Sequence, residues 1–182
     1  MTEGQKPTSK IVVLISGSGS NLQSIINACE ENNIDAQISA VISNKYNVKG
    51  LDRAAAANIP SIVIDHHAFE TRQAFDQYLA EVISGFTPDL IILAGFMRIL
   101  TEEFVNQFVG KLINIHPSLL PAYPGLNTHQ RAIEAGDRTA GATVHFVTPE
   151  LDGGPSILRA QVAVLENDTS DALAARVLTI EH

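Results

Sequence analysis

Asn114 and His116 are the residues of this chain whose types and spacing most readily suggest chemistry. They stand two positions apart in an apolar run that ends at Pro117. Residues two apart on an extended strand point to the same face, so Asn114 and His116 are predicted to project together while Ile113 and Ile115 face a core. A carboxamide and an imidazole at a strand end can both donate to a developing oxyanion. The alternative is that both side chains merely satisfy nearby backbone groups.

Asp152 is the second candidate for chemistry, because it stands in an acidic and glycine-rich stretch, Glu150-Leu151-Asp152-Gly153-Gly154-Pro155. This composition is typical of a turn, and its glycines also free the backbone to bring the carboxylate close to another group. Beside His116, the carboxylate would favour the imidazolium form, which can stabilise a negative oxygen and move protons. The sequence has no Gly-x-Ser-x-Gly elbow, so direct attack of a bound nucleophile on a bound acyl donor is the simpler mechanism.

A glycine- and serine-rich loop, residues 16–21, lies between a predicted strand and a predicted helix. Backbone N–H groups and the helix dipole favour an anion at such a place. Leu22 stands where the dinucleotide fingerprint has its third glycine, and Ser43-Asn44 supply no acid for a ribose after the second predicted strand. A single phosphate is therefore the predicted ligand, and NAD and ATP are disfavoured. The alternative is a turn that only lets the helix pack on the strand.

The other histidines show no spacing typical of a zinc site, and the sequence predicts no metal. His66 and His67 follow a predicted strand, and His129 lies in the first turn of a predicted helix. His145 lies within a predicted strand and is the best rival to His116 for the catalytic role.

Alternating strands and helices are predicted to position these residues. Strands are predicted at residues 10–15, 37–42, 61–64, 90–93, 111–115, 142–147 and 156–164, and helices at 21–31, 50–57, 70–83, and from 101, 128 and 170. This order predicts an α/β, Rossmann-like fold, a mostly parallel twisted sheet with helices on both faces. The last two strands are close in sequence and predict an antiparallel edge near the C-terminus.

Length and end patterns predict the domain organisation. The chain has 182 residues, which suits one domain with a real core. Residues 1–9 are polar and are expected to form a disordered lead-in, and residues 10–182 a single domain. The apolar pattern of the last helix runs to His182 without a stop signal, so this domain is expected to be truncated at its C-terminus.

Composition narrows the class of protein. The chain is 45% apolar and 18% charged, as ordinary globular proteins are, and its net charge of -8 argues against non-specific nucleic-acid binding. Its one cysteine, Cys29, cannot form an internal disulfide, which favours a reducing compartment. The start lacks the apolar segment of a signal peptide, and no apolar run approaches the ~20 residues of a membrane span. The predicted location is cytoplasmic, without a membrane or nucleic-acid partner.

Four segments together resemble the phosphoribosylglycinamide formyltransferases, folate-dependent enzymes of purine synthesis in the formyltransferase superfamily. They are residues 15–22, 93–100, 114–121 and 150–155, and the likeness extends from Lys10 to His182. The Asn-x-His pair and the later aspartate are shared with superfamily members that act on methionyl-tRNA. Residues 123–129 resemble the purine branch, because the arginine-glycine pair of the tRNA branch is missing.

The resemblance implies transfer of a formyl group from 10-formyltetrahydrofolate, as co-substrate, to the amine of glycinamide ribonucleotide. It implies that Asn114 and His116 stabilise a tetrahedral intermediate and that Asp152 assists proton transfer. The residues implied to bind glycinamide ribonucleotide are Gly19, Ser20, Asn21 and Glu181. Those implied to bind the folate are Arg72, Met97, Arg98, Ile99, Leu100 and Asn114, although residues 97–100 could by themselves be core.

Two positions depart from the family pattern, since Leu178 replaces a glutamine of the last helix and Asn127 a frequent histidine. Two other functions would use the same site, a formyltetrahydrofolate hydrolase with water as acceptor and a non-catalytic nucleotide- or folate-binding module. The expected partners are small molecules, and the expected assembly is a monomer or a homodimer. The proline-rich loop of residues 117–127 is a candidate lid.

Overall fold

The structure, a computed structural model, describes residues 8–182, so most of the lead-in expected over residues 1–9 lies outside the described part. The chain divides into two compact units between Phe96 and Met97. The first strand begins at Ser9, one residue inside the expected lead-in.

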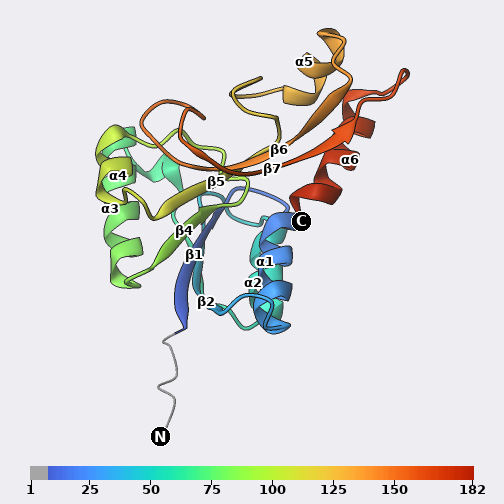
Figure 1. Ribbon diagram of the computed structural model, residues 1–182. Helices are drawn as coiled ribbons and strands as arrows, with labels where there is room; N and C mark the ends of the chain where they lie inside the picture. The colour runs from blue at the N-terminus through green and yellow to red at the C-terminus, as the bar shows by residue number, and fades with distance from the viewer. Residues whose placement is uncertain (1–7) are drawn as a thin grey trace, which may run out of the picture. The chain divides into compact units, whose positions relative to one another are not determined.

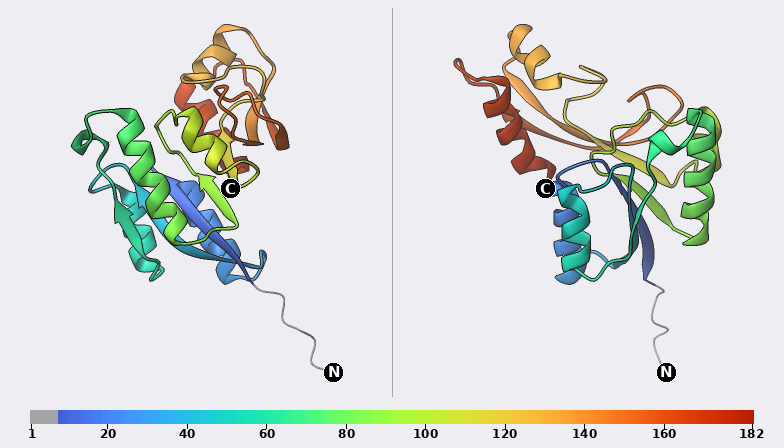
Figure 2. Two further views of the ribbon diagram at one scale, coloured as in Figure 1. Left: turned by 90° about the vertical axis from the view of Figure 1, so that its left-hand side faces the viewer. Right: turned by 180° about the vertical axis from the view of Figure 1, so that it is seen from behind.

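The first unit is a parallel sheet with helices on both faces. Its strands are β1 (Ser9–Ile15), β2 (Ala36–Ser43), β3 (Ser61–Val63) and β4 (Leu90–Leu93), and its helices are α1 (Ser20–Glu30), α2 (Lys49–Ala56), the 3-10 turn η1 (His66–Ala68) and α3 (Arg72–Gly85). The strand order is β3-β2-β1-β4, with parallel pairing throughout. Helices α1 and α2 lie on one face and α3 on the other (Figures 1 and 2).

The core of the first unit follows from its apolar pattern. The run Ile11–Ile15 of the central strand β1 is at most 4% exposed, as a strand covered on both faces requires. Helix α3 starts at a cap in which Thr71 Oγ1 accepts from the Ala74 N–H at 3.1 Å. Its buried face includes Phe75, Leu79 and Ile83, which lie at helical spacing.

The second unit combines an antiparallel sheet with short helices. Its elements are α4 (Glu102–Gln107), β5 (Leu112–His116), α5 (Thr128–Glu134), β6 (Thr139–Phe146), β7 (Ser156–Ala163) and α6 (Ser170–Glu181). Strands β5, β6 and β7 pair antiparallel in that order. Helix α6 packs against α5, β6 and β7. A cluster of small and branched apolar side chains fills this contact: Ala132, Ala140, Ala142, Leu173 and Val177.

The predicted fold class is confirmed, with a parallel sheet in the first unit and an antiparallel arrangement of the C-terminal strands in the second. One detail differs in β5, where Leu112 and His116 are buried but Ile113 and Ile115 are only partly so. Within residues 8–182, no helix combines the length and apolar character needed to cross a membrane.

Candidate active site

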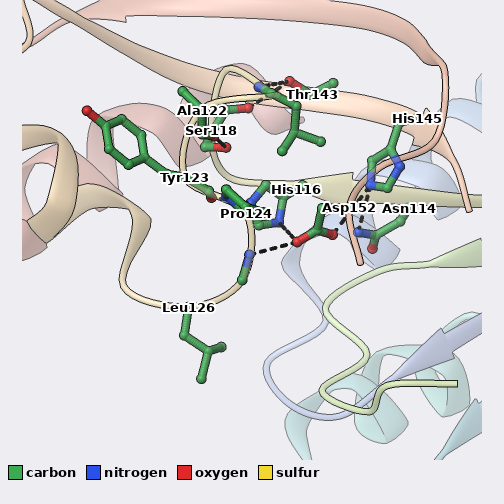
Figure 3. Close-up of polar contacts among 12 residues, drawn as sticks. Asn114, His116, Ser118, Ala122, Tyr123, Pro124, Leu126, Thr143, His145 and Asp152 are labelled. Carbon is green, nitrogen blue, oxygen red and sulfur yellow. Dashed lines mark hydrogen bonds and ion pairs between the residues drawn. The ribbon is translucent and has the colours of Figure 1, made fainter. Parts of the chain in front are cut away.

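Asn114, His116 and Asp152 come together in the second unit. Strand β5 carries Asn114 and His116, and Asp152 lies in the turn between β6 and β7. His116 Nδ1 lies 3.5 Å from Asp152 Oδ2, and the two side chains are only 7% and 9% exposed. Figure 3 shows the three side chains directed toward one another. A buried imidazole and a buried carboxylate are thus placed to share a proton.

The hydrogen bonds of His116 determine which of its nitrogens faces this partner. His116 Nε2 lies 2.9 Å from the carbonyl oxygen of Tyr123. A carbonyl only accepts, so Nε2 carries a hydrogen and donates it. Nδ1 is therefore the nitrogen that can gain or lose a proton, and it is the one that faces Asp152.

The backbone around Asp152 is shaped to present its carboxylate. Asp152 has φ of 51°, a left-handed conformation that aspartate tolerates better than most residues. A Cβ at Gly154 would lie 1.8 Å from the carbonyl oxygen of Phe146, so only glycine fits there. Asp152 Oδ2, the oxygen that faces His116, also accepts a hydrogen bond of 2.8 Å from the N–H of Gly125.

His145 is the fourth polar residue of this cluster. It pairs with Asn114 across β5 and β6, and its Nε2 lies 3.2 Å from Asn114 Nδ2 and 3.7 Å from Asp152 Oδ1. Burial lowers the pKa of His145, against an opposing effect of its bond to the Phe146 carbonyl and of Asp152. From the sequence, His145 is a rival to His116 for the catalytic role. The structure instead places both histidines at the same carboxylate, with His116 slightly closer.

The loop that touches His116 and Asp152 is braced by side chains outside the predicted site. Tyr123 OH donates to Asp137 Oδ2 at 2.6 Å, and this bond raises the pKa of Tyr123. Arg131 donates to the Pro124 carbonyl at 2.7 Å and lies over the Tyr123 ring, 5.2 Å from its centroid. Sequence reasoning missed this brace because the loop meets the site through backbone atoms, which carry no residue-type signal.

The glycine loop of the first unit is turned so that its carbonyls face α2. Gly17 O accepts from the N–H of Gly50 at 3.0 Å, and Ser18 O accepts from Arg53 Nε at 2.9 Å. Gly19 has φ of 68°, and a Cβ there would lie 2.6 Å from the Cα of Gly50. The contacts of Gly50 and Arg53 with this loop were not predicted from the sequence. The glycine near the start of α2 was the one signal that could have indicated such a contact.

The start of α1 has two features that favour an anion. Gly19 stands at its N-cap and offers no side chain to cap the first backbone N–H groups. Ser20 and Asn21 open the helix, so their N–H groups point away from its C-terminus, at the positive end of the dipole. The sequence-predicted trio of Gly19, Ser20 and Asn21 thus forms one local structure.

The residues proposed for the folate lie in both units. Arg72 is the exposed first residue of α3 in the first unit. Residues 97–100 form an irregular segment of the second unit, in which Met97 and Ile99 are 64% and 58% exposed while Arg98 and Leu100 are partly buried. The alternative interpretation of this segment as core is therefore wrong for Met97 and Ile99, which are exposed.

Glu181 lies at the end of α6. Burial lowers the pKa of His129, and the charge of Glu181 opposes this effect only in part. Leu178, one of the two departures from the family pattern, is partly buried on the same helix. Asn127, the other, precedes α5 with φ of 56°, a conformation that asparagine adopts readily.

One group of described side chains has the proximity that a cation would need: Asp65, His66 and His67 offer ligand atoms within 4.8 Å of one another. The His66 Nδ1 atom is already in contact with the carbonyl and carboxamide of Asn44. These residues belong to the first unit and include none of the catalytic candidates.

A cavity of about 170 Å³ lies beside the braced loop in the second unit, lined by residues that include Ser118, Tyr123, His129 and Arg138. Asn114, His116 and Asp152 are not among its lining residues. We therefore do not assign the acyl donor to this cavity.

Comparisons with known proteins show the family of this chain. The formyl transferase family matches residues 9–182. The chain is 54% identical over 172 residues to the phosphoribosylglycinamide formyltransferase of Escherichia coli, with 94% of this chain and 81% of the relative covered. It is 47% identical to part of a trifunctional purine biosynthetic protein of Homo sapiens, of which it spans 18%.

Solved structures show the same likeness. The glycinamide ribonucleotide transformylase 1 of Symbiobacterium toebii superposes with a TM-score of 0.94 at 43% identity, covering 99% of this chain and 87% of that one. The phosphoribosylglycinamide formyltransferase of Coxiella burnetii gives a TM-score of 0.91 at 47% identity, over 96% of this chain and 82% of that one. The resemblance found in the sequence is confirmed, and the chain belongs to the formyl transferase family.

Proposed function

We propose that this protein transfers the formyl group of 10-formyltetrahydrofolate to the amine of glycinamide ribonucleotide, a step of purine synthesis, in the cytoplasm. The observation that carries the proposal is the meeting of Asn114, His116 and Asp152 in a chain of the formyl transferase family. The similarity to phosphoribosylglycinamide formyltransferases over more than nine-tenths of the chain supports the choice of acceptor.

The proposed reaction proceeds by direct attack. The amine nitrogen bonds to the formyl carbon, which becomes tetrahedral and places negative charge on the formyl oxygen. Asn114 Nδ2 and protonated His116 Nδ1 donate to that oxygen. The C–N10 bond then breaks, the proton lost by the amine passes to N10, and tetrahydrofolate leaves.

His116 and Asp152 are suited to the proton movements of this reaction. The Tyr123 carbonyl holds His116 Nε2–H, so proton exchange falls on Nδ1, whose neighbour at 3.5 Å is the Asp152 carboxylate. The carboxylate stabilises the imidazolium and can accept the amine proton, directly or through one water. The Gly125 N–H fixes Asp152 Oδ2 in this position.

Each unit contains residues that we propose bind a substrate. The uncapped start of α1, at Gly19, Ser20 and Asn21, is proposed to hold the phosphate, and Glu181 to contact the amine substrate. Arg72 and residues 97–100, with Asn114, are proposed to bind the folate. We include no metal in this mechanism, and we propose a monomer or homodimer.

An isotopic assay tests this function. Wild-type protein would be given folate carrying a ¹³C-formyl group, with and without glycinamide ribonucleotide, and the products followed by mass spectrometry. We expect labelled formyl on the amine in step with folate consumption, and no formate release without the acceptor. Labelled formate at the turnover rate without acceptor would identify a hydrolase instead, and tight binding of both substrates without product would identify a binding module.

A further inference from the structure

His145 has a tautomer that its neighbours fix. Its Nδ1 lies 2.9 Å from the carbonyl oxygen of Phe146, and a carbonyl can only accept. Nδ1 must therefore carry a hydrogen. In a neutral imidazole with Nδ1–H, the other nitrogen, Nε2, has a lone pair and accepts.

Burial favours the neutral form of this imidazole. His145 is 2% exposed, and burial lowers its pKa. The titratable groups that act on it are Asp152, which raises its pKa, and His116, which lowers it. The Asp152 Oδ1 atom lies 3.7 Å from Nε2, beyond hydrogen-bond range, so the carboxylate accepts no hydrogen bond from that nitrogen.

The tautomer of His145 decides the orientation of Asn114. A carboxamide has a donor end and an acceptor end that are similar in shape, and only a neighbour can select between them. The atom of Asn114 that lies 3.2 Å from His145 Nε2 must be the nitrogen, because Nε2 has no hydrogen to give. The nitrogen donates one hydrogen to His145 and can donate its second hydrogen to another group.

We propose that His145 is a positioning residue for formyl transfer, whose Nδ1–H tautomer orients the Asn114 carboxamide so that its nitrogen faces the reacting oxygen. This inference rests on the proposed function. His145 does not touch the substrates in this scheme; it acts through Asn114. If His145 carried its hydrogen on Nε2, the carboxamide would turn over, and its oxygen would repel the oxyanion.

The tautomer can be measured without any assay of activity. Long-range ¹H–¹⁵N correlation spectra of ¹⁵N-histidine-labelled wild-type protein at pH 7.5, assigned with a His145→Gln sample, report the protonation of each ring nitrogen. We expect a protonated Nδ1 and an unprotonated Nε2 at His145. A hydrogen on Nε2, alone or in the imidazolium, would overturn the inference. Because this measurement does not require turnover, it is independent of whether the isotopic assay supports formyl transfer.

Two substitutions test the consequence for the reaction. In His145→Gln the side-chain oxygen can accept in place of Nε2, so kcat should stay within a few-fold of wild type. His145→Leu removes the acceptor and should lower kcat by about 10- to 100-fold, with little change in the KM of either substrate. This fall in kcat should be no larger than the fall caused by losing a whole oxyanion donor.

A combined variant shows whether His145 acts through Asn114. In an Asn114→Ala background the partner is already gone, so adding His145→Leu should cause no further loss. A further loss as large as that of His145→Leu alone would contradict the inference. Should His145→Leu fail to fold, the tautomer measurement still decides.

Discussion

The glycine loop of the first unit and the histidine–aspartate cluster of the second are built in opposite ways. Gly19, Ser20 and Asn21 are consecutive at the start of one helix, and we propose that they act through their backbone. His116 and Asp152 come from separate strands and turns, act through side chains, and are held by the backbone of a third segment at Tyr123 and Gly125. A contiguous backbone site depends on local conformation, whereas a side-chain cluster depends on the packing of several segments.

This contrast predicts different failures in the two regions. Changes in the cluster should lower the rate of the chemical step, and changes in the loop should weaken substrate binding and stability. Changes that loosen the brace around Tyr123 should fall between these, because the brace affects geometry without removing a reacting group.

The largest expected effect is on the chemical step. His116→Ala removes the proton-carrying Nδ1, and Asp152→Asn removes the charge beside it. Each should lower the single-turnover rate by about 10²-fold or more, the range expected of general acid–base and oxyanion groups. Rapid-quench measurement with both substrates saturating would check this, and near-wild-type rates in both variants would remove the cluster from the mechanism.

The glycine loop should respond mainly in binding. Gly19→Ala places a methyl group 2.6 Å from the Gly50 Cα at a φ of 68°, so the loop or α2 must shift. We expect KM for the phosphorylated amine to rise by about 10-fold, and the free energy of unfolding to fall by about 1–3 kcal/mol. Gly17→Ala is the matched control, since its Cβ would meet nothing within 4 Å, and it should keep the wild-type melting temperature. Equal effects of the two changes would refute the role of loop geometry.

Loosening the contacts that Tyr123 makes with Asp137 and Arg131 should have a smaller effect on the catalytic rate. Tyr123→Phe removes the hydrogen bond to Asp137 but keeps the ring on which Arg131 lies. The Tyr123 carbonyl and the Gly125 N–H would then be held less firmly, and kcat should fall a few-fold while hydrogen exchange over residues 118–126 speeds up. Faster exchange without any change in kcat would show that the brace does not position His116.

The smallest effect on catalysis is expected from a change at Asp168. Such a change tests whether the stability of the protein can be altered without altering its catalytic rate. Arg176 donates to both carboxylate oxygens, at 2.6 and 2.8 Å, and this pair lowers the pKa of Asp168 from 3.8 to about 2. The stabilisation is therefore present above pH ~4 and is lost as the pH falls through about 2.

Asp168→Asn should lower the melting temperature by a few degrees at pH 7 and leave kcat unchanged. Calorimetry at a series of pH values should find this difference shrinking toward pH 2. A difference that is constant with pH would mean that the carboxylate charge is not what stabilises the wild type.

Local signals in the sequence located most of the fold. The strand at residues 90–93 matches the structure because an apolar run between turn residues acts within a few positions. The helix start at Ser170 matches because the Thr169 side chain caps it, and the start at Thr128 matches without a side-chain cap. The prediction that Asn114 and His116 share one face of a strand likewise depends only on neighbouring positions.

The parts that could not be predicted depend on contacts between distant segments. Nothing near His116 in the sequence shows that the Tyr123 carbonyl fixes its tautomer, and nothing near Asn114 shows that His145 pairs with it. The same holds for Gly50, whose lack of a side chain matters only because Gly19 packs against it. Backbone groups and cross-strand partners have no signature that composition or spacing reveals.

The central claim is that His116 and Asp152 act as one unit in formyl transfer. Single-turnover rates of His116→Ala, Asp152→Asn and the double variant test this most directly. If the pair is one unit, the double variant should be about as slow as the slower single variant. Losses that multiply in full in the double variant would show that the two side chains act independently and would contradict the account.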